Sequence, residues 1–468
     1  MKMREPLFAT LPRPRALALA GRRVLVLGLG DTGLSVANWV RGEGGSVRVA
    51  DTRAAPPRAA DFAAGELRSG PFEASLLRGV DLVCISPGLA LSAPVVLEAL
   101  ARGLPVLGDI ELFAWAVRER TRSKVLAVTG TNGKSTVSAL TGALLRAAGI
   151  DCEVAGNIGP PALEALARRR AAPPAAWVLE LSSYQLETTW SLEPQAAAML
   201  NLSEDHLDRY AGLAEYAAAK GRIFLGAGLQ VLNRCDSASM ALALPERAQV
   251  TFGLDAPPVA EDFGLAAAAD GREWLARGVE RFLPLAELPL HGRHNACNAL
   301  AAAALAHAAG APLAALAAGL RAFGGLPHRL QRVALRRGVA WYDDSKGTNV
   351  GATIAALKGL APQKAVLIAG GEGKGQSFAP LAAPVREGAR AVLLIGRDAP
   401  AIEAALAASG VPLERCATLE QAVARAALLA RTGDAVLLSP ACASFDMFRD
   451  YAHRGEVFAS AVKGLSGE

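Results

Sequence analysis

Cysteine is scarce in this chain, which has six in 468 residues: Cys84, Cys152, Cys235, Cys297, Cys416 and Cys442. No two of them lie within four positions of one another, and this spacing excludes CxxC redox pairs and zinc knuckles. It also gives no indication of a disulfide framework. We therefore expect reduced thiols packed among small and apolar residues, in a reducing compartment.

The chain also lacks a convincing signal peptide or membrane-spanning run. Its basic N-terminal stretch is interrupted by prolines and arginines. Residues 298–320 carry no Asp, Glu, Lys or Arg, but they are mostly alanine and are interrupted by His307, Gly310 and Pro312. We interpret them as two short buried helices joined by a turn at 310–312. The prediction is a cytoplasmic protein with no membrane insertion.

Neither sign of charge is in large excess. Lys plus Arg is 49 and Asp plus Glu is 44, which gives a net charge of +5. The basic residues are scattered, so the charge does not indicate a nucleic-acid partner, although it is compatible with small anionic substrates. Hydrophobic residues make up 52% and charged residues 20%, which excludes global disorder. At roughly 100–200 residues per domain, the length predicts about three domains.

Short β-branched or apolar runs alternate with Ala/Leu/Arg-rich helical stretches almost throughout the chain. This alternation is typical of right-handed βαβ units, so we predict an α/β fold with mainly parallel sheets. No repeat of 20–50 residues is visible. The candidate strands are 23–27, 46–50, 82–85, 125–128, 177–181, 197–200, 365–368, 391–395 and 435–438.

Two glycine-rich loops of the phosphate-binding type follow predicted strands, at Gly28 and at Gly130. One sheet rarely needs two such loops, so they indicate two sheets and two domains. A third block begins after Gly324 and Gly325, and the next two residues, Leu326 and Pro327, resemble a hinge. The predicted domains are residues 1–115, 116–325 and 326–468.

The first glycine loop has the pattern Gly28-x-Gly30-x-x-Gly33 after a strand and at the start of a helix. Such glycines allow a tight turn, and the helix N-terminus offers free N–H groups to a diphosphate. Asp51 ends the next strand, where it is placed to accept from a ligand hydroxyl, and an ISPGL turn at 85–89 could close the same crevice. An NAD site, a UDP-sugar site and a turn that serves only packing all fit this pattern.

The second glycine loop, GTNGKST at 130–136, carries the chemistry. Its backbone N–H groups would cradle ATP phosphates, Lys134 would neutralise the β and γ oxygens, and Ser135 would hold Mg²⁺. The full eight-residue pattern needs glycine at 128, where this chain has Val128, so the loop is a shorter variant. A lysine at a helix N-terminus is electrostatically costly without an anion, which argues against a merely structural loop.

Carboxylate and imidazole groups lie at later strand ends in the same block. Glu180 ends one predicted strand, and Asp205, His206 and Asp208 follow another. These groups are credible Mg²⁺ ligands, with water at the remaining positions. The structural alternatives are a solvated acid for Glu180 and a buried packing histidine for His206.

Motifs along nearly the whole chain resemble the Mur ligase family, the ATP-dependent amino-acid ligases of cell-wall precursor synthesis. They occur in family order: TGTNGKST (129–136), AGNIG (155–159), ELSSYQLE (180–187), NLSEDHLDRY (201–210), YAAAKGRIF (216–224), GRHNACNALAA (292–302), GLPHRLQ (325–331), DDSKGTNVGAT (343–353), GGEGKG (370–375) and LSPACASFDMF (438–448). The first glycine loop with its DTR, and the DSKGTN and SPACASFD motifs, are most similar to the D-glutamate-adding branch.

The resemblance implies a Rossmann-like N-terminal domain, a P-loop ATPase-like central domain and a Rossmann-like C-terminal domain. It implies that a monomer adds D-glutamate to UDP-N-acetylmuramoyl-L-alanine through an acyl phosphate, with ATP and two Mg²⁺ ions and no nucleic acid. It places Lys134, Lys220, His206 and Arg329 in catalysis. It assigns Ser135, Glu180, His206 and Lys220 to the metals, the last as a carbamate. Without the resemblance, Lys220 would be an ordinary helix-surface lysine.

The remaining implied roles concern binding. Residues matching ATP contacts are Gly130, Thr131, Asn132, Gly133, Lys134, Ser135, Thr136, Asn298, Arg329, Asp344 and Lys346. Residues expected to hold the UDP substrate are Gly30, Asp31, Thr32, Asp51, Thr52, Arg53, Gly88 and Asn157. Residues matching the D-glutamate site are Thr348, Lys374, Ser444 and Tyr451.

Three residues depart from the family pattern. Glu372 stands where Asp is expected, and Tyr184 and Tyr451 stand where Phe is more usual. These changes affect fine geometry and leave the expected reaction intact. The rival interpretations are an NAD-dependent oxidoreductase, which leaves the lysine loop unexplained, another Mur-type or folylpolyglutamate-type ligase, and a nucleotide-binding switch that is not an enzyme.

Overall fold

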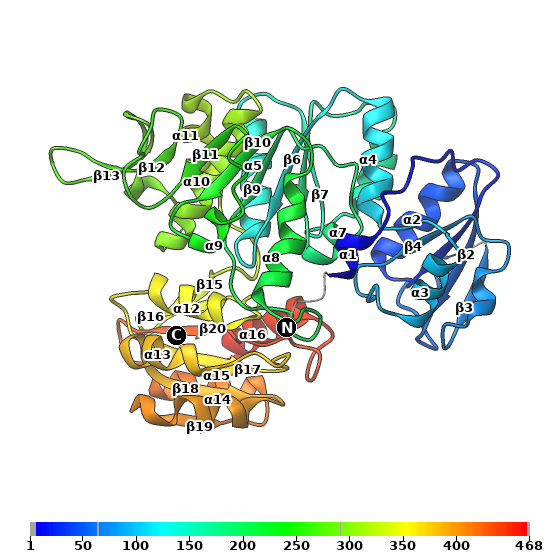
Figure 1. Cartoon of the computed structure of the whole chain (residues 1–468). Helices are drawn as coiled ribbons and strands as arrows, with labels where there is room; N and C mark the ends of the chain where they lie inside the picture. Colours follow the sequence, from blue (N-terminus) through cyan, green and yellow to red (C-terminus); the bar gives the residue numbers. More distant parts are fainter. Residues whose placement is uncertain (1–5, 63–64, 291, 466–468) are drawn as a thin grey trace, which may run out of the picture.

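The computed structural model describes residues 6–62, 65–290 and 292–465. These residues form three sheets, of five, nine and six strands. Figure 1 shows each sheet in its own lobe: the N-terminal lobe in blue, the central lobe in cyan and green, and the C-terminal lobe in yellow to red. The predicted three-domain α/β fold is confirmed. The ends of the predicted outer domains, 1–5 and 466–468, lie outside the described residues.

The N-terminal sheet is parallel, with the strand order β3-β2-β1-β4-β5. Successive connections leave β1 in opposite directions, so a crevice opens between the carboxyl ends of β1 and β4, where such sheets bind ligands. Its elements are α1 (Leu7–Thr10), β1 (Arg23–Leu27), α2 (Asp31–Gly42), β2 (Ser46–Asp51), β3 (Glu66–Ser69), η1 (Ala74–Leu77), β4 (Leu82–Ile85), α3 (Pro94–Ala101) and β5 (Val106–Leu107).

Helix α4 (Asp109–Arg120) connects the N-terminal sheet to the central sheet, and the predicted boundary near 115 falls inside it. The central sheet has the order β14-β13-β12-β11-β10-β9-β6-β8-β7. Its strands are β6 (Lys124–Thr129), β7 (Cys152–Gly156), β8 (Ala176–Glu180), β9 (Ala196–Met199), β10 (Leu229–Asn233), β11 (Gln249–Phe252), β12 (Phe263–Ala267), β13 (Glu273–Arg277) and β14 (Glu280–Pro284). The β12–β13 and β13–β14 pairs are antiparallel, and the other strand pairs of this sheet are parallel.

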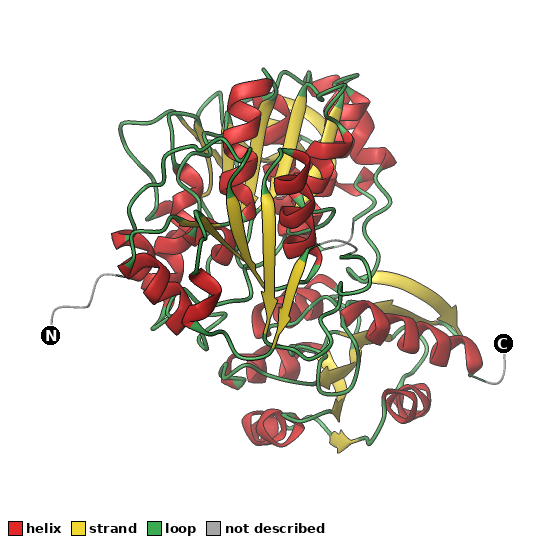
Figure 2. Cartoon of the chain, turned by 90° about the vertical axis from the view of Figure 1, so that its right-hand side faces the viewer, coloured by secondary structure: helices red, strands yellow, loops and turns green. Residues whose placement is uncertain are grey.

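Helices cover both faces of the central sheet, as Figure 2 shows. Alternate side chains of β6 enter different cores: Leu126 and Val128 join one cluster, and Val125 and Ala127 join another that continues into the N-terminal lobe. The helices are α5 (Lys134–Ala147), α6 (Ala162–Arg168), α7 (Ser183–Glu187), α8 (Leu213–Gly221), η2 (Arg222–Phe224), α9 (Ser237–Met240), η3 (Leu285–Glu287), α10 (Arg293–Ala308) and α11 (Leu313–Ala322).

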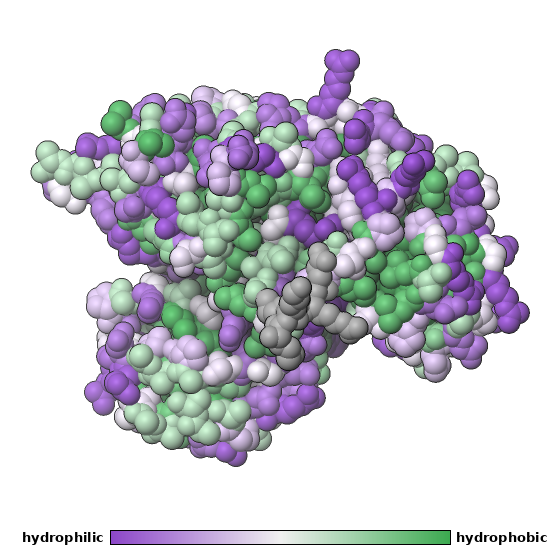
Figure 3. Space-filling model, in the orientation of Figure 1, coloured by the Kyte–Doolittle hydropathy of each residue, from purple (hydrophilic) through white to green (hydrophobic). Residues whose placement is uncertain are grey.

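The C-terminal sheet has the order β15-β16-β20-β17-β18-β19. Among the described strands of this sheet, only the β15–β16 pair is antiparallel. In Figure 3 an indentation separates this lobe from the central lobe. Its elements are β15 (Gln331–Arg336), β16 (Val339–Asp343), α12 (Val350–Gly359), β17 (Ala365–Gly370), η4 (Ala379–Leu381), α13 (Ala382–Gly388), β18 (Ala389–Ile395), α14 (Ala399–Leu406), η5 (Ala407–Ser409), β19 (Leu413–Arg415), α15 (Leu419–Leu429), β20 (Ala435–Leu438) and α16 (Tyr451–Gly464).

Several expectations can be compared with this fold. Each of the nine predicted strands overlaps an observed strand, and the alanine-rich stretch at 298–320 lies in two helices, α10 and α11. None of the helices in the described part of the chain is long and apolar enough to cross a membrane. All six cysteines are free thiols, but Cys235 is exposed, so the expectation that every thiol is packed is wrong for that residue.

Candidate active site

The loop between β6 and α5 is shaped by close backbone approach. Gly130 and Gly133 both have positive φ angles, +151° and +85°. A Cβ on Gly133 would lie 2.5 Å from Oδ1 of Asn298, and one on Gly130 would lie 2.9 Å from Cβ of Leu200. Only glycine fits at these two positions. The approach also puts Asn298, a predicted ATP contact on α10, against the predicted phosphate loop.

Lys134, the first residue of α5, turns back over this loop. Its Nζ donates to the carbonyl oxygens of Gly130, at 2.9 Å, and Thr131, at 2.8 Å. Burial lowers the pKa of Lys134, while the charges of Glu180 and Asp205 oppose that shift. The ammonium group is therefore held at the loop, where an anionic ligand would restore its preference for the charged form.

Glu180 ends β8 beside the end of β7, and it is buried. Its Oε1 accepts a 2.6 Å hydrogen bond from Nδ2 of Asn157, while its Oε2 is buried with no hydrogen-bond partner. The alternative of a solvated acid at this position is therefore wrong. A buried, unpaired carboxylate oxygen near the phosphate loop fits a divalent cation.

A divalent cation at this place would need ligands from the nucleotide or from water. No group of three or more His, Cys, Asp or Glu side chains that could hold a metal ion occurs among the described residues. Mg²⁺ is often bound by one or two carboxylates together with phosphate oxygens and water, so this donor set is compatible with Mg²⁺.

Lys220, in the last turn of α8, is 1% exposed, so the surface-lysine interpretation is wrong. Its Nζ donates to the carbonyl oxygen of Gly130 at 2.8 Å and to Oγ1 of Thr129 at 3.3 Å. It also lies 4.7 Å from the ring centre of Tyr216. Burial first, and repulsion from Lys134 second, bring the pKa of Lys220 well below its ordinary value. A neutral amine is the form that can react with CO₂.

His206 lies in the loop after β9 with a positive φ of 56°. Its backbone N–H donates to Oδ1 of Asp205 at 2.9 Å, and its Nδ1 lies 2.7 Å from the hydroxyl of Tyr184. Oδ2 of Asp205 accepts from Asn349, which also contacts the phosphate loop, whereas Asp208 is exposed to solvent. The structure therefore brings two of the three predicted groups of this loop toward the phosphate loop.

The C-terminal lobe reaches the phosphate loop through side chains. Nη2 of Arg329 donates to Oγ of Ser135 at 3.1 Å. Asn349, which caps α12, donates to Oδ1 of Asn132 at 3.0 Å and to Oδ2 of Asp205 at 3.3 Å. Sequence reasoning assigned no role to Asn349, although it lies inside the DDSKGTNVGAT motif.

A small cavity of about 70 Å³ lies where these two lobes meet. Asp344 lines it, and burial raises the pKa of this carboxyl to about 6. Nearby, Lys346 lies 5.0 Å from the ring centre of Tyr451, and burial lowers its pKa to about 8. Six predicted ATP contacts line the cavity: Asn132, Gly133, Thr136, Asn298, Arg329 and Asp344.

The N-terminal crevice is a cavity of about 550 Å³. Gln185 of the central lobe also lines it, so the cavity spans two lobes. All residues expected to hold the UDP substrate line it: Gly30, Asp31, Thr32, Asp51, Thr52, Arg53, Gly88 and Asn157. The ISPGL turn closes one side, as predicted.

Asp51 lines the crevice and also makes several contacts within the protein. Its carboxylate accepts from the backbone N–H of Leu29 at 2.7 Å and from the backbone and guanidinium of Arg53, and the side chain is 2% exposed. The hydrogen bond from Arg53 lowers the pKa of Asp51 to about 2. Both carboxylate oxygens are used within the protein, so Asp51 holds the glycine loop in place. Arg53 is half-exposed and lines the crevice beside it.

Three of the four residues predicted to hold D-glutamate come from loops at the carboxyl ends of three adjacent parallel strands, and the fourth, Tyr451, begins α16. Thr348 follows β16, Lys374 follows β17 and Ser444 follows β20. Backbone hydrogen bonds between Glu372 and Ala443 tie two of these loops together. Because carboxyl ends of parallel strands meet at one edge, the three side chains share one side of the lobe.

Arg454, on α16, was missed by sequence reasoning. Its guanidinium is buried and donates to Oγ and the carbonyl oxygen of Ser345 and to the carbonyls of Cys442 and Ala443. It therefore joins the loop after β16 to the loop after β20. Nothing in the local sequence distinguishes it from a surface arginine of a helix.

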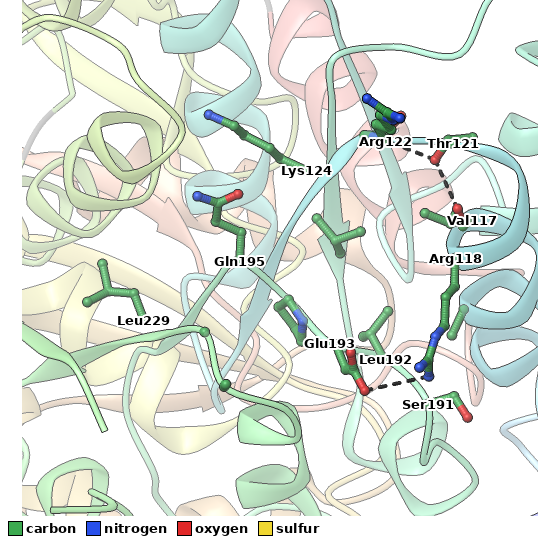
Figure 4. Close-up of a pocket in the computed structure, with 16 residues that line it drawn as sticks. Val117, Arg118, Thr121, Arg122, Lys124, Ser191, Leu192, Glu193, Gln195 and Leu229 are labelled. Atoms are coloured by element: carbon green, nitrogen blue, oxygen red, sulfur yellow. Dashed lines mark hydrogen bonds and ion pairs between the residues drawn. The ribbon is translucent and has the colours of Figure 1, made fainter. Parts of the chain in front are cut away.

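A further cavity of about 610 Å³ contains none of the predicted site residues. It lies at the amino ends of β6 and β10 (Figure 4). Its basic side chains do not converge. Arg118 lies 3.7 Å from Glu193, and Lys124 donates to the carbonyl of Ala309 at 2.8 Å. The candidate active site is therefore at the opposite, carboxyl ends of the strands.

Comparison with known families agrees with this geometry. Three family models match the chain: "Mur ligase MurD-like, N-terminal domain" over residues 22–108, "Mur ligase middle domain" over 128–306, and "Mur ligase, glutamate ligase domain" over 328–442. The chain belongs to the Mur ligase family.

Curated relatives are similar over nearly the full length. A UDP-N-acetylmuramoylalanine–D-glutamate ligase of Thiobacillus denitrificans is 55% identical, over 97% of this chain and 98% of the relative. A protein of the same name from Nitrosospira multiformis is 56% identical, over 96% of each chain.

Solved structures show the same fold at low identity. A UDP-N-acetylmuramate–alanine ligase from Thermotoga maritima has a TM-score of 0.61 at 19% identity, covering 94% of this chain and 99% of that one. MurF from Acinetobacter baumannii has a TM-score of 0.62 at 18% identity, covering 95% and 91%.

Proposed function

We propose that this chain is the ATP-dependent ligase that adds D-glutamate to UDP-N-acetylmuramoyl-L-alanine, with release of ADP and phosphate, in peptidoglycan precursor synthesis. The observation that carries the proposal is the 2.6 Å hydrogen bond between Asn157 and Glu180. Asn157 lines the N-terminal crevice, and Glu180 lies beside the phosphate loop. A substrate bound in the crevice can therefore present its carboxylate to the γ-phosphate of ATP.

The proposed reaction has two steps. The carboxylate of the UDP substrate attacks the γ-phosphorus, which forms an acyl phosphate and releases ADP. The amine of D-glutamate then attacks the acyl carbon through a tetrahedral intermediate, loses a proton and expels phosphate. Two anions must meet in the first step, so the main task of the protein is electrostatic, and Lys134 and Arg329 supply positive charge at the phosphates.

Two metal sites are part of the proposal. Glu180, through its unpaired Oε2, and Ser135 would hold Mg²⁺, which neutralises phosphate charge when bound. Lys220, carbamylated, would provide oxygen ligands for a second Mg²⁺. The buried position of Lys220, with its lowered pKa, supports the presence of the neutral amine that carbamylation requires.

Closure of the lobes would exclude water from the acyl phosphate. Arg329 follows the hinge-like segment near 326 and already contacts Ser135, so movement about that segment would carry the D-glutamate loops toward the phosphate loop. We also propose domain boundaries near 115 and 326, a monomeric state and a cytoplasmic location.

An ADP-release assay tests the proposed function. ATP turnover should require both UDP-N-acetylmuramoyl-L-alanine and D-glutamate, and omission of either should reduce ADP release to background. Turnover with UDP-N-acetylmuramate and L-alanine would instead indicate another Mur-type ligase, and turnover with a folate and L-glutamate would indicate a folylpolyglutamate-type ligase.

A further inference from the structure

Three charged side chains, which we call the ionic triad, meet where the N-terminal and central lobes join. Glu43 follows α2 of the N-terminal lobe, Arg120 ends α4, and Arg170 follows α6 of the central lobe. Nη1 of Arg120 donates to Oε1 of Glu43 at 2.9 Å, and its Nη2 donates to Oε2, so this pair is bidentate. Nη1 of Arg170 lies 3.1 Å from Oε1 of Glu43. One carboxylate therefore joins the ends of three helices across two lobes.

The ionic triad differs from an ordinary surface ion pair. The side chain of Glu43 is only 12% exposed, and the guanidinium of Arg120 also lies 5.5 Å from the ring centre of Trp39 on α2. The pKa of Glu43 is lowered, chiefly by the hydrogen bond from Arg120, and the charge of Arg170 acts in the same direction. Isolated surface pairs contribute little, but bidentate geometry within a network of charges is the recognised exception.

Two helices connect the ionic triad to the N-terminal crevice. Asp31 begins α2 and Pro161 precedes α6, and both residues line the crevice, whereas the opposite ends of these helices carry the triad. The helices pack against each other, and their buried side chains belong to one apolar cluster. Apolar packing is not directional, so it holds the helices together without fixing the angle between them. Because α2 is about 18 Å long, a small rotation at the triad moves the crevice residues at its other end.

We propose that Glu43 is a positioning residue that, through its two arginine partners, fixes the angle between the N-terminal and central lobes and thereby sets the affinity for the UDP substrate. Asp31 and Arg53 line the crevice from the N-terminal lobe, and Asn157 and Pro161 line it from the central lobe. A ligand that spans the crevice needs both walls at the right separation. The identity of that ligand rests on the proposed function, but the control of the lobe angle does not.

The lobe angle can be measured without substrates by small-angle X-ray scattering. Glu43→Gln keeps the size of the side chain and removes its charge, so the lobes should sample more angles and the radius of gyration should increase, with an unchanged circular dichroism spectrum. Glu98→Gln is the matched control, because its carboxylate pairs with Arg102 within α3 and joins no lobes. A scattering curve of Glu43→Gln identical to wild type would overturn the proposal. Failure of the ligation assay would not affect this measurement, so the two proposals fail separately.

Binding and kinetics give a second readout. Glu43→Gln should raise the Kd and KM for UDP-N-acetylmuramoyl-L-alanine about fivefold, the effect of one good ion pair. Its kcat and its KM values for ATP and D-glutamate should change less than about twofold, because the bound substrate itself holds the two walls. Arg170→Gln should act in the same direction and more weakly. Glu43→Gln combined with Arg120→Gln should lose no more affinity than Glu43→Gln alone. Additive losses, or a fall in kcat as large as the rise in KM, would contradict the positioning role.

Discussion

Lys134 lies where the phosphates of ATP are expected to bind. Its Nζ also donates to two carbonyl oxygens of its own loop, those of Gly130 and Thr131. We predict that Lys134→Ala lowers kcat at least about 100-fold, because a charge-assisted contact to the γ-phosphate is lost in the transition state. Circular dichroism should show an unchanged fold. Lys124→Ala is the control at the other end of β6, and its kcat should stay near wild type. More than a tenth of wild-type turnover in Lys134→Ala would refute the assignment.

Lys220 allows a test by chemical rescue. Lys220→Ala should be nearly inactive, and acetate should partly restore ADP release, because a small carboxylate can occupy the position of the carbamate. Lys220→Arg should not be rescued, since its guanidinium fills the space with the wrong charge. Lys463, an exposed lysine of α16, provides a control substitution with little expected effect. Near-normal activity of Lys220→Ala would rule out the carbamate.

At the scale of single residues, the sequence was informative where the backbone itself makes the site. The tight turn at Gly130 and Gly133 was predictable because it depends on the local sequence. The ion pair of Asp51 with Arg53 was not predicted, because Arg53 folds back from two positions away and nothing in the letters DTR shows that. Lys220 was recognised only through the family resemblance, since burial of a helix residue depends on distant packing.

The glycine loop between β1 and α2 gives a prediction at the scale of elements. We expect it to bind the diphosphate of a uridine nucleotide, because Asn157 lines its crevice and donates a hydrogen bond to Glu180. Titration calorimetry with UDP-N-acetylmuramoyl-L-alanine and with NAD compares the two ligands directly. Lys134→Ala should keep the uridine affinity. Tighter binding of NAD than of the UDP-sugar would contradict this interpretation.

Helix α4 carries a pH-dependent group in its first turn. Asp109 accepts one hydrogen bond, from Gln185 at 3.1 Å, and its Oδ1 is buried without a partner. Burial raises its pKa from an ordinary 3.8 to about 6. Because the folded-state pKa is the higher one, the stabilising effect of the protonated form is fully present below about 3.8 and is lost as the pH rises through 6.

This pH dependence can be measured through the melting temperature. Asp109→Asn should stabilise the protein at pH 8 by about 1–3 kcal/mol, a Tm increase of several degrees, and should have little effect at pH 4. Glu111→Gln is the control in the same turn. Its carboxylate accepts from Trp115, Trp190 and Ser191, so the variant should lose stability at both pH values. An Asp109→Asn effect that is independent of pH would contradict the buried-carboxyl account.

Element prediction found nine strands of the three sheets, but it missed β10 and β16, which are buried inside their sheets, as well as strands at the sheet edges. The runs that became β4 and β20 are continuously apolar, β1 is apolar after Arg23, and the predicted ends of all three match the structure. The hairpin of β13 and β14 was missed because its charged residues, such as Glu273 and Arg281, obscure the alternation of a half-buried strand. Strand β5 has two residues, too few for any pattern to register.

At the scale of the whole molecule, the lobes meet through contacts that no local pattern predicts. Arg329 and Ser135 are 194 positions apart, and Asn349 and Asn132 are 217 apart. The family resemblance supplied the role of Arg329, but the bridge made by Asn349 became visible only in three dimensions. These contacts bring residues of the central and C-terminal lobes that are predicted to bind ATP around one cavity.

The most direct measurement of the central claim is the mass of the product. Incubation with ATP, Mg²⁺, UDP-N-acetylmuramoyl-L-alanine and D-glutamate should convert the UDP-sugar to a species heavier by one glutamate residue, with one ADP formed per product. L-Glutamate in place of D-glutamate should yield little product. A UDP-sugar of unchanged mass, recovered after ATP has been consumed by a folded protein, would contradict the assignment of this chain as a D-glutamate ligase.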